Sequence, residues 1–263
     1  MIPKIIHYCW FSNGKGLPKE LKRNIASWKT MLPDYEFMLW DNSSFNLEEW
    51  PFAKEAFEKK KYAFTSDVAR LYAMYTYGGI YLDTDVQILK KFDDLLHLPY
   101  FAGLEHTGIM ESAIIGVEKN SGWIATCLKY YDNKSFIKED GSYDLKILPT
   151  ILKLQLNTVR EIVLMSSSQV NEVENLIKDE SKFFLFPFDY FSPKDVESGQ
   201  IHKTENTYTI HHFSGSWLPA FSIVRRKVKL MLGVNTINNL LKIKVVSSFL
   251  GYLKKIEAKL DNK

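Results

Sequence analysis

Two aspartates separated by a single residue, Asp83 and Asp85, are the residues whose type and spacing point most directly to chemistry. They follow the apolar run Ile80-Tyr81-Leu82, which predicts a short buried strand ending at the pair. Two carboxylates this close repel each other unless a cation lies near both. Oxygen ligands without thiolates favour Mg²⁺ or Mn²⁺. Such an ion can bridge a diphosphate and neutralise the charge that builds on a leaving phosphate.

The position of this pair in the chain separates two interpretations. In an extended chain both side chains would project on one side of the strand, about 7 Å apart. A bare Asp-x-Asp sequence is more often a solvated turn without a ligand. Here the pair ends a buried strand, where open α/β sheets bind ligands, and this favours a metal site.

A second charged pair, Asp67 and Arg70, lies one predicted helix upstream. Their spacing of three residues places both side chains on one helix face. They can form a charged clamp on the sugar and phosphate of a donor molecule, or a simple surface ion pair. The spacing alone does not separate these two interpretations.

The elements that must position these residues alternate between strand and helix through the first half of the chain, which favours an α/β fold with a largely parallel sheet. Thr65 or Ser66 is the expected N-cap of the helix that carries Asp67, and Gly78-Gly79 is expected to end that helix. The patterns predict strands at 4–10, 35–40, 80–82, 86–89, 100–104, 113–117, 183–187 and 207–213, and helices at 18–31, 52–60, 67–77, 122–131 and 149–156.

The composition is that of a globular protein. Of 263 residues, 46% are hydrophobic and 25% charged, which excludes a disordered chain, a collagen-like repeat and a disulfide scaffold as the main architecture. The aromatic content of 14% suits a large packed core or a stacking pocket. Only Cys9 and Cys127 are cysteines, so we expect free thiols in a reducing compartment and no cysteine-based zinc site. No signal-peptide pattern opens the sequence and no run of about 18 apolar residues occurs, which predicts a cytoplasmic protein.

Charge is distributed unevenly along the chain. Residues 222–263 contain ten basic and two acidic residues, a net charge of +8, whereas residues 1–221 carry a net charge of −5. Leu, Ile, Val and Phe lie between the basic residues, a pattern typical of an amphipathic helix on an anionic membrane surface. The alternative is a pair of ordinary helices that pack on the rest of the protein. The acidic body offers no companion basic face, so nucleic-acid binding is not expected.

Four motifs in order resemble glycosyltransferase family 32, which includes bacterial capsule and lipopolysaccharide sugar transferases and relatives of the yeast initiating mannosyltransferase. The resemblance covers about residues 1–218, and the glucosylating domains of the large clostridial toxins share the family's core. The motifs are Ile2-Pro3-Lys4-Ile5-Ile6-His7, Ser66-Asp67-x-x-Arg70, Gly78-Gly79-Ile80-Tyr81-Leu82-Asp83-Thr84-Asp85 and His211-His212-Phe213-Ser214-Gly215-Ser216-Trp217.

The resemblance implies a GT-A fold over residues 1–221, a Rossmann-like mixed sheet flanked by helices, followed by a basic helical tail at 222–263. It also implies roles for individual residues. The implied metal ligands are Asp83, Asp85 and His211, which corresponds to a histidine on the last strand of related transferases. Neighbouring strand residues point to opposite faces, so only one of His211 and His212 can face the metal. The implied catalytic residues are Asp67, Arg70, Asp83 and Asp85. The implied donor-binding residues are Trp10, Asp67, Arg70, Tyr81, Asp83, Ser214, Ser216 and Trp217.

The family further implies a retaining, metal-dependent hexosyl transfer that uses Mn²⁺ or Mg²⁺. The donor would be a UDP-hexose or, as second choice, GDP-mannose, and the acceptor a saccharide or lipid-linked saccharide in bacterial surface polysaccharide synthesis. The enzyme would be cytoplasmic, or peripheral on the inner face of the cytoplasmic membrane. No residue is an unambiguous nucleophile, although Glu105 is a weak candidate, so we favour front-face attack. A metal-dependent phosphohydrolase and a non-catalytic nucleotide-sugar-binding protein are the alternatives.

Overall fold

The computed structural model describes residues 1–215. Within that range, Met1–Asp195 and the residues from Ile201 onward belong to one compact unit, and Val196–Gln200 are grouped separately. The predictions for Ser216, Trp217 and the basic tail lie outside the described residues. The boundary between residues 221 and 222 therefore stays a prediction.

A five-stranded mixed sheet forms the centre of the unit, which confirms the predicted α/β class. The strand order is β2 (Glu36–Trp40), β1 (Ile5–Cys9), β3 (Gly79–Leu82), β6 (Met110–Val117) and β5 (Tyr100–Leu104). β1 runs parallel to β2 and β3, but β6 is antiparallel to both β3 and β5. β2, β1, β3 and β5 therefore run in one direction and β6 alone runs against them. This antiparallel strand, which strand–helix alternation does not predict, arises because no helix separates β5 from β6.

Two small sheets complete the strand inventory of the described residues. β4 (Val86–Ile88) pairs antiparallel with β9 (Thr209–His211), and β7 (Glu161–Leu164) pairs parallel with β8 (Lys182–Leu185). The pairing of β4 with β9 joins segments more than 100 residues apart in sequence. It brings the end of the described chain back to the residues that follow β3.

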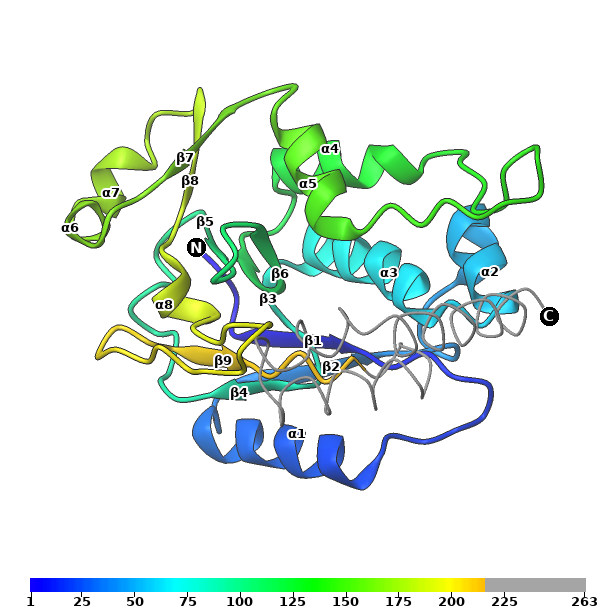
Figure 1. Cartoon of the computed structure of the whole chain (residues 1–263), viewed down its shortest axis with the longest axis horizontal. Helices are drawn as coiled ribbons and strands as arrows, with labels where there is room; N and C mark the ends of the chain where they lie inside the picture. The colour runs from blue at the N-terminus through cyan, green and yellow to red at the C-terminus, as the bar shows by residue number, and fades with distance from the viewer. Residues whose placement is uncertain (216–263) are drawn as a thin grey trace, which may run out of the picture. The chain divides into compact units, whose positions relative to one another are not determined.

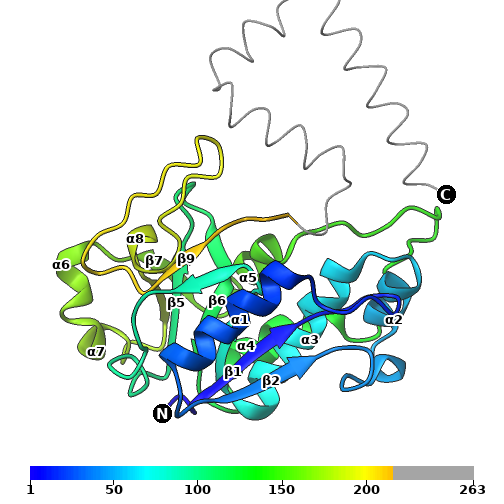
Figure 2. The ribbon, with the colours of Figure 1, turned by 90° about the horizontal axis from the view of Figure 1, so that it is seen from below.

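Helices cover the two faces of the central sheet. Helix α1 (Lys19–Met31) lies on one side, and α3 (Tyr62–Tyr77), α4 (Gly122–Leu128) and α5 (Leu148–Leu156) lie on the other (Figure 1). Figure 2 views the molecule from the side on which α1 lies. The shorter helical segments are α2 (Pro51–Glu58), α6 (Ser167–Val170), α7 (Val173–Leu176), α8 (Phe188–Phe191) and two 3₁₀ turns at Leu47–Glu49 and Lys129–Tyr131.

Alternation along β3 explains this layering. Ile80 and Leu82 belong to the hydrophobic cluster that contains Trp28 of α1, whereas Tyr81 belongs to the cluster that contains α3, α4 and α5. Neighbouring strand residues point to opposite faces, so a fully buried strand contributes to both cores. The Asp83-Thr84-Asp85 segment follows directly after this buried strand.

The predicted N-caps of the helix that carries Asp67 are wrong. Helix α3 begins at Tyr62, so Thr65 and Ser66 lie inside its first turns. The Ser66 hydroxyl donates to the carbonyl of Tyr62 four residues earlier, and the Thr65 hydroxyl donates to the carbonyl of Ala53 in α2. Both side chains therefore bond to backbone carbonyls within and between helices rather than capping an amide. Strand β7 and helices α6, α7 and α8 were not predicted.

The Gly78-Gly79 pair ends α3 and starts β3, as the sequence predicts. Both glycines have positive φ, of 66° and 108°. A Cβ on Gly78 would lie 2.5 Å from the amide nitrogen of Lys119, and one on Gly79 would lie 2.6 Å from the carbonyl oxygen of Ile5. Only glycine allows the chain to turn this tightly from the helix into the middle of the sheet.

The thiols of the two cysteines agree with the expectation from composition. Cys9 and Cys127 are both buried free thiols, as predicted. Within residues 1–215, no helix has the length and apolar character needed to cross a bilayer.

His7 links three segments of the central sheet. Its ring is fully buried, and its Nε2–H donates to the carbonyl of Gly78 at 2.7 Å. Its Nδ1 accepts from the indole N–H of Trp40 at 3.1 Å. Since an indole nitrogen only donates, the imidazole must be neutral with its proton on Nε2. Burial lowers the pKa of His7 to about 4, against the opposing effect of the Gly78 carbonyl.

We therefore expect His7 to make the fold sensitive to mild acid. Between pH 6.5 and about 4 the unfolded chain binds a proton at His7 that the folded chain excludes. The stabilisation is complete above pH 6.5 and is lost as the pH falls to about 4, by about 3 kcal/mol in total. In urea titrations, His7→Gln should have a lower free energy of unfolding than wild type at pH 7. The difference between the two proteins should be smaller at pH 4.5. The control His202→Gln changes an exposed histidine and should give the same difference from wild type at both pH values; a constant deficit for His7→Gln would contradict the prediction.

Candidate functional site

The Asp-x-Asp segment is a turn, not an extended strand. The amide of Val86 donates to the carbonyl of Asp83 at 2.9 Å, which closes a four-residue turn after β3. The expectation of extended geometry about 7 Å wide is therefore wrong, because the chain reverses to start β4. The turn brings ligand atoms of Asp83 and Asp85 together with one of His211, and these atoms lie within 4.8 Å of one another.

The β4–β9 ladder delivers the histidine. His211 pairs with Val86, and the amide of the next residue, His212, donates to the carbonyl of Asp85 at 3.2 Å. Nε2 of His211 lies 3.5 Å from Oδ1 of Asp85. His212 turns away, with Nε2 at 3.0 Å from the side-chain oxygen of Gln87. The structure thus brings the preferred histidine of the two to the aspartates, and its role as a metal ligand stays a prediction.

The residues after His212 bend back toward the acids. Phe213 has φ of 51°, an uncommon value for a bulky residue, and its ring centre lies 3.8 Å from that of His211. The amide of Ser214 then donates to Oδ2 of Asp85 at 2.6 Å. Burial acts to raise the pKa of Asp85, but His211 and Ser214 outweigh it and hold the pKa well below its usual range. The Asp85 carboxylate is therefore ionised, and the hydrogen bond from Ser214 fixes its orientation.

Arg70 holds the other acid of the pair. It is 5% exposed, and its guanidinium lies 3.2 Å from Oδ1 of Asp83 and 3.4 Å from Oδ1 of Asp67. Its Nη1 donates to the carbonyl of Ser112 at 2.6 Å, and its carbon lies 4.2 Å from the ring centre of Tyr81. The predicted i, i+3 pair is thus buried beneath the Asp-x-Asp turn rather than spread over the surface.

Tyr81 shares the same carboxylate oxygen. Its hydroxyl donates to Oδ1 of Asp83 at 2.8 Å, and burial raises its pKa well above the usual value. Burial also raises the pKa of Asp67 to about 7, although Arg70 acts in the opposite direction. Asp83 Oδ1 is therefore engaged by two donors, which fix the orientation of the carboxylate.

Glu111 of β6 lies against His211 from the opposite side to Asp85. Its side chain is 1% exposed, and Oε2 lies 3.0 Å from Nδ1 of His211. Burial acts to lower the pKa of His211, but Glu111 and Asp85 outweigh it and hold the pKa well above its usual range. The sequence analysis missed Glu111, because it places the start of this strand at Ala113. An acidic residue two positions before an apolar strand run was the available signal.

The other predicted site residues are less closely connected to this group. The indole N–H of Trp10 donates to the carbonyl of Lys15 at 3.0 Å, and the predicted stacking on a base stays a prediction. Glu105 accepts a hydrogen bond from the Thr107 hydroxyl at 3.3 Å. Burial raises the pKa of Glu105 to about 7, and Glu111 adds to this effect. Within residues 1–215, no hydrogen bond joins Glu105 to the Asp-x-Asp pair, so its assignment as nucleophile stays a prediction.

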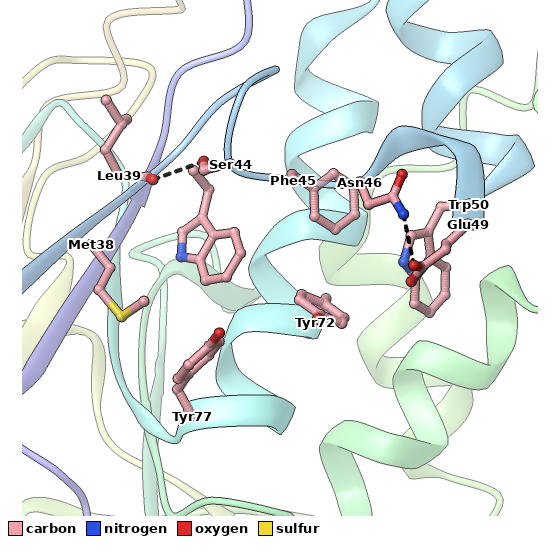
Figure 3. A pocket seen from close by; sticks show the side chains of 10 residues that line it. Met38, Leu39, Ser44, Phe45, Asn46, Glu49, Trp50, Tyr72 and Tyr77 are labelled. Atoms are coloured by element: carbon pink, nitrogen blue, oxygen red, sulfur yellow. Dashed lines mark hydrogen bonds between the residues drawn. The ribbon is translucent and has the colours of Figure 1, made fainter.

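An aromatic pocket lies elsewhere, between β2, the segment after it and α3 (Figure 3). Its walls include Trp40, Phe45, Trp50, Tyr72 and Tyr77, with Ser44, Asn46 and Glu49 as the polar members. None of the predicted site residues lines it. The aromatic richness of the sequence therefore contributes to packing and to this pocket, apart from the acidic group.

The donor set suits a divalent metal ion. Two carboxylates and one imidazole offer oxygen and nitrogen ligands, and their side chains are 29%, 14% and 11% exposed for Asp83, Asp85 and His211. Such a set is compatible with Mg²⁺ or Mn²⁺. The residues present thus fit a resident cation that solvent and a ligand can reach.

Comparison with known proteins gives a consistent result. Residues 18–102 match the family model described as the glycosyltransferase sugar-binding region containing the DXD motif. Inositol phosphoceramide mannosyltransferase 3 of Schizosaccharomyces pombe is 33% identical over 122 residues, which cover 45% of this chain and 34% of that protein. Mannosyl phosphorylinositol ceramide synthase SUR1 of Saccharomyces cerevisiae is 31% identical over 146 residues, which cover 52% of this chain and 37% of that protein.

The chain thus aligns with about a third of the length of these two relatives. Among solved structures, the galactosyltransferase LgtC in complex with donor and acceptor sugar analogues aligns with 87% of this chain and 94% of its own, at 11% identity and a TM-score of 0.41. Residues 18–102 therefore match the DXD-containing sugar-binding region of glycosyltransferases, the enzymes that the four sequence motifs resemble.

Proposed function

We propose that this chain transfers a hexose from a nucleoside-diphosphate sugar to a saccharide or lipid-linked saccharide. The observation that carries the proposal is the convergence of Asp83, Asp85 and His211 within 4.8 Å at the end of β3. In the proposal these residues hold Mn²⁺ or Mg²⁺. A cation held there would neutralise negative charge that develops on the departing nucleoside diphosphate.

The chain's own residues prepare this site before a donor arrives. Arg70 and Tyr81 fix Asp83 through one oxygen, and the Ser214 amide fixes Asp85. Acids held in this way need no reorganisation when charge develops in the transition state. Electrostatic stabilisation by such preorganised groups is usually the largest single contribution to catalysis. Asp67 and Arg70 stay proposed donor contacts, and the burial of Arg70 supports a second role for it in positioning Asp83.

The identity of the donor and the acceptor is proposed from the relatives. The two relatives described above are named for mannosyl transfer to inositol phosphoceramide, a lipid-linked acceptor. This favours GDP-mannose, the second choice from the sequence, as much as a UDP-hexose. Retention by front-face attack and a place in surface polysaccharide synthesis remain part of the proposal, as does contact of the basic residues 222–263 with an anionic membrane.

Replacement of the two adjacent histidines tests the metal site. We expect His211→Ala to abolish the Mn²⁺-dependent rise in melting temperature that UDP or GDP produces, because one of three ligands is removed. His212→Ala is the matched control, since it removes the neighbouring ring that contacts Gln87 instead. It should keep the Mn²⁺-dependent rise. Equal behaviour of the two variants in the thermal-shift assay would refute the proposed ligand set.

Arg70 provides a test of the buried network. We expect Arg70→Met to lower the free energy of unfolding by about 3–5 kcal/mol, because it leaves the buried Asp67 and the partly buried Asp83 without their cation. Arg70→Lys should recover part of this loss but not the bond to Ser112. Urea unfolding measures both values. Arg23→Met, on the exposed side of α1, serves as the control and should change stability by at most about 0.5 kcal/mol.

A donor panel tests the activity itself. Purified full-length protein with Mn²⁺, a set of UDP- and GDP-hexoses and lipid-linked saccharide acceptors should yield one product whose mass increases by one hexose. NMR of that product should show the anomeric configuration of the donor. Inversion would contradict front-face attack. Nucleotide binding without turnover would favour a non-catalytic protein, and phosphate release from simple phosphoesters would favour a phosphohydrolase.

A further inference from the structure

Three consecutive residues at the start of β6 hold three different parts of the site. The carboxylate of Glu111 contacts His211, the carbonyl of Ser112 accepts from Arg70, and the carbonyl of Ala113 accepts from the amide of Asp83 at 2.9 Å. This strand is therefore the element on which the acids, the arginine and the histidine are placed relative to one another.

Glu111 has a single available orientation. Its Oε1 accepts from the amide of Ala113 at 2.7 Å, and its Oε2 lies 3.0 Å from Nδ1 of His211. Both oxygens are engaged and the side chain is 1% exposed, so water does not compete for either contact. The hydrogen bond between Glu111 and His211 thus has a fixed direction.

We propose that Glu111 is a positioning residue that directs Nε2 of His211 toward the metal. The Nδ1–H donates to the Glu111 carboxylate. When a cation displaces the proton on Nε2, the lone pair of the neutral ring therefore lies on Nε2, the atom that is 3.5 Å from Asp85. The carboxylate fixes both the tautomer and the plane of the ring. This inference rests on the proposed function, because it concerns the same cation.

The competing explanation is a purely structural ion pair. Removing one partner of a buried ion pair destabilises the fold, because it leaves the other charge buried and unpaired. The two explanations therefore predict different results for Glu111→Met. A structural pair predicts a change in folding, whereas a positioning residue predicts a loss of metal affinity in a protein that still folds.

Glu105 provides a matched control for charge. It interacts electrostatically with both Glu111 and His211, yet within residues 1–215 no hydrogen bond joins it to His211. At a pH above the pKa of about 7 that burial gives Glu105, Glu105→Gln removes the same unit of negative charge as Glu111→Gln. Any additional loss in Glu111→Gln thus reports the hydrogen bond rather than the charge.

The experiment measures the affinity of the full chain for Mn²⁺ alone, from the electron paramagnetic resonance signal of the free ion, without nucleotide or acceptor. We expect Glu111→Met to bind Mn²⁺ 10- to 100-fold more weakly than wild type. Glu111→Gln should also bind at least threefold more weakly, because an amide cannot accept from both Ala113 and His211. Glu105→Gln should stay within threefold of wild type.

Two outcomes overturn the inference. One is wild-type affinity in both Glu111 variants, and the other is an equal loss in Glu105→Gln. Near-UV circular dichroism monitors folding, and Glu111→Gln, which preserves shape, decides the question if Glu111→Met fails to fold. His211→Ala in the same series distinguishes the proposed metal site from the positioning role of Glu111. If this variant binds Mn²⁺ as wild type does, the proposed metal site itself is wrong.

Discussion

The concentration of negative charge at one point of the sheet is the constraint on which the rest of this structure depends. Asp67, Asp83, Asp85 and Glu111 converge at the end of β3 and the start of β6, and all four are mostly removed from water. Within the described residues, Arg70 and His211 are the cationic groups placed between them. Like charges in a low dielectric repel strongly, so the arrangement persists only where partners are held at hydrogen-bond distance.

The fold meets this constraint by bringing rigid elements from distant parts of the sequence to one edge. Helix α3 supplies Asp67 and Arg70, the turn after β3 supplies Asp83 and Asp85, and β9 returns with His211. Strand β6 lies antiparallel to β3 and touches each of these parts. Sites built on paired strands and a buried helix keep their geometry better than sites on loops, because each side chain is locked by packing on both sides.

The sequence predicted what depends on local pattern and missed what depends on pairing between strands. Alternating apolar runs located β1, β2, β3 and β5, and the glycine pair correctly marked the end of α3. Spacing could not reveal that the Asp-x-Asp segment turns, because the pairing of β4 with β9 is set more than 100 residues away. Glu111 was missed for the same reason. Its function depends on a histidine that no local window contains, and single-sequence periodicity carries no information on such a contact.

The free-energy cost of burying Arg70 indicates that this network contributes to the site rather than to the stability of the fold. Its Nε is buried without a hydrogen-bond partner among residues 1–215, and an unsatisfied buried donor destabilises a protein by about 1–3 kcal/mol. Its two carboxylate contacts, at 3.2 and 3.4 Å, are longer than a well-formed charge-assisted hydrogen bond. An apolar residue of similar volume, with apolar partners, would stabilise this position at least as well. The guanidinium instead orients Asp83 and offsets the charge of the acids beneath the turn. We therefore expect that selection for activity, rather than for stability, maintains an arginine at this position.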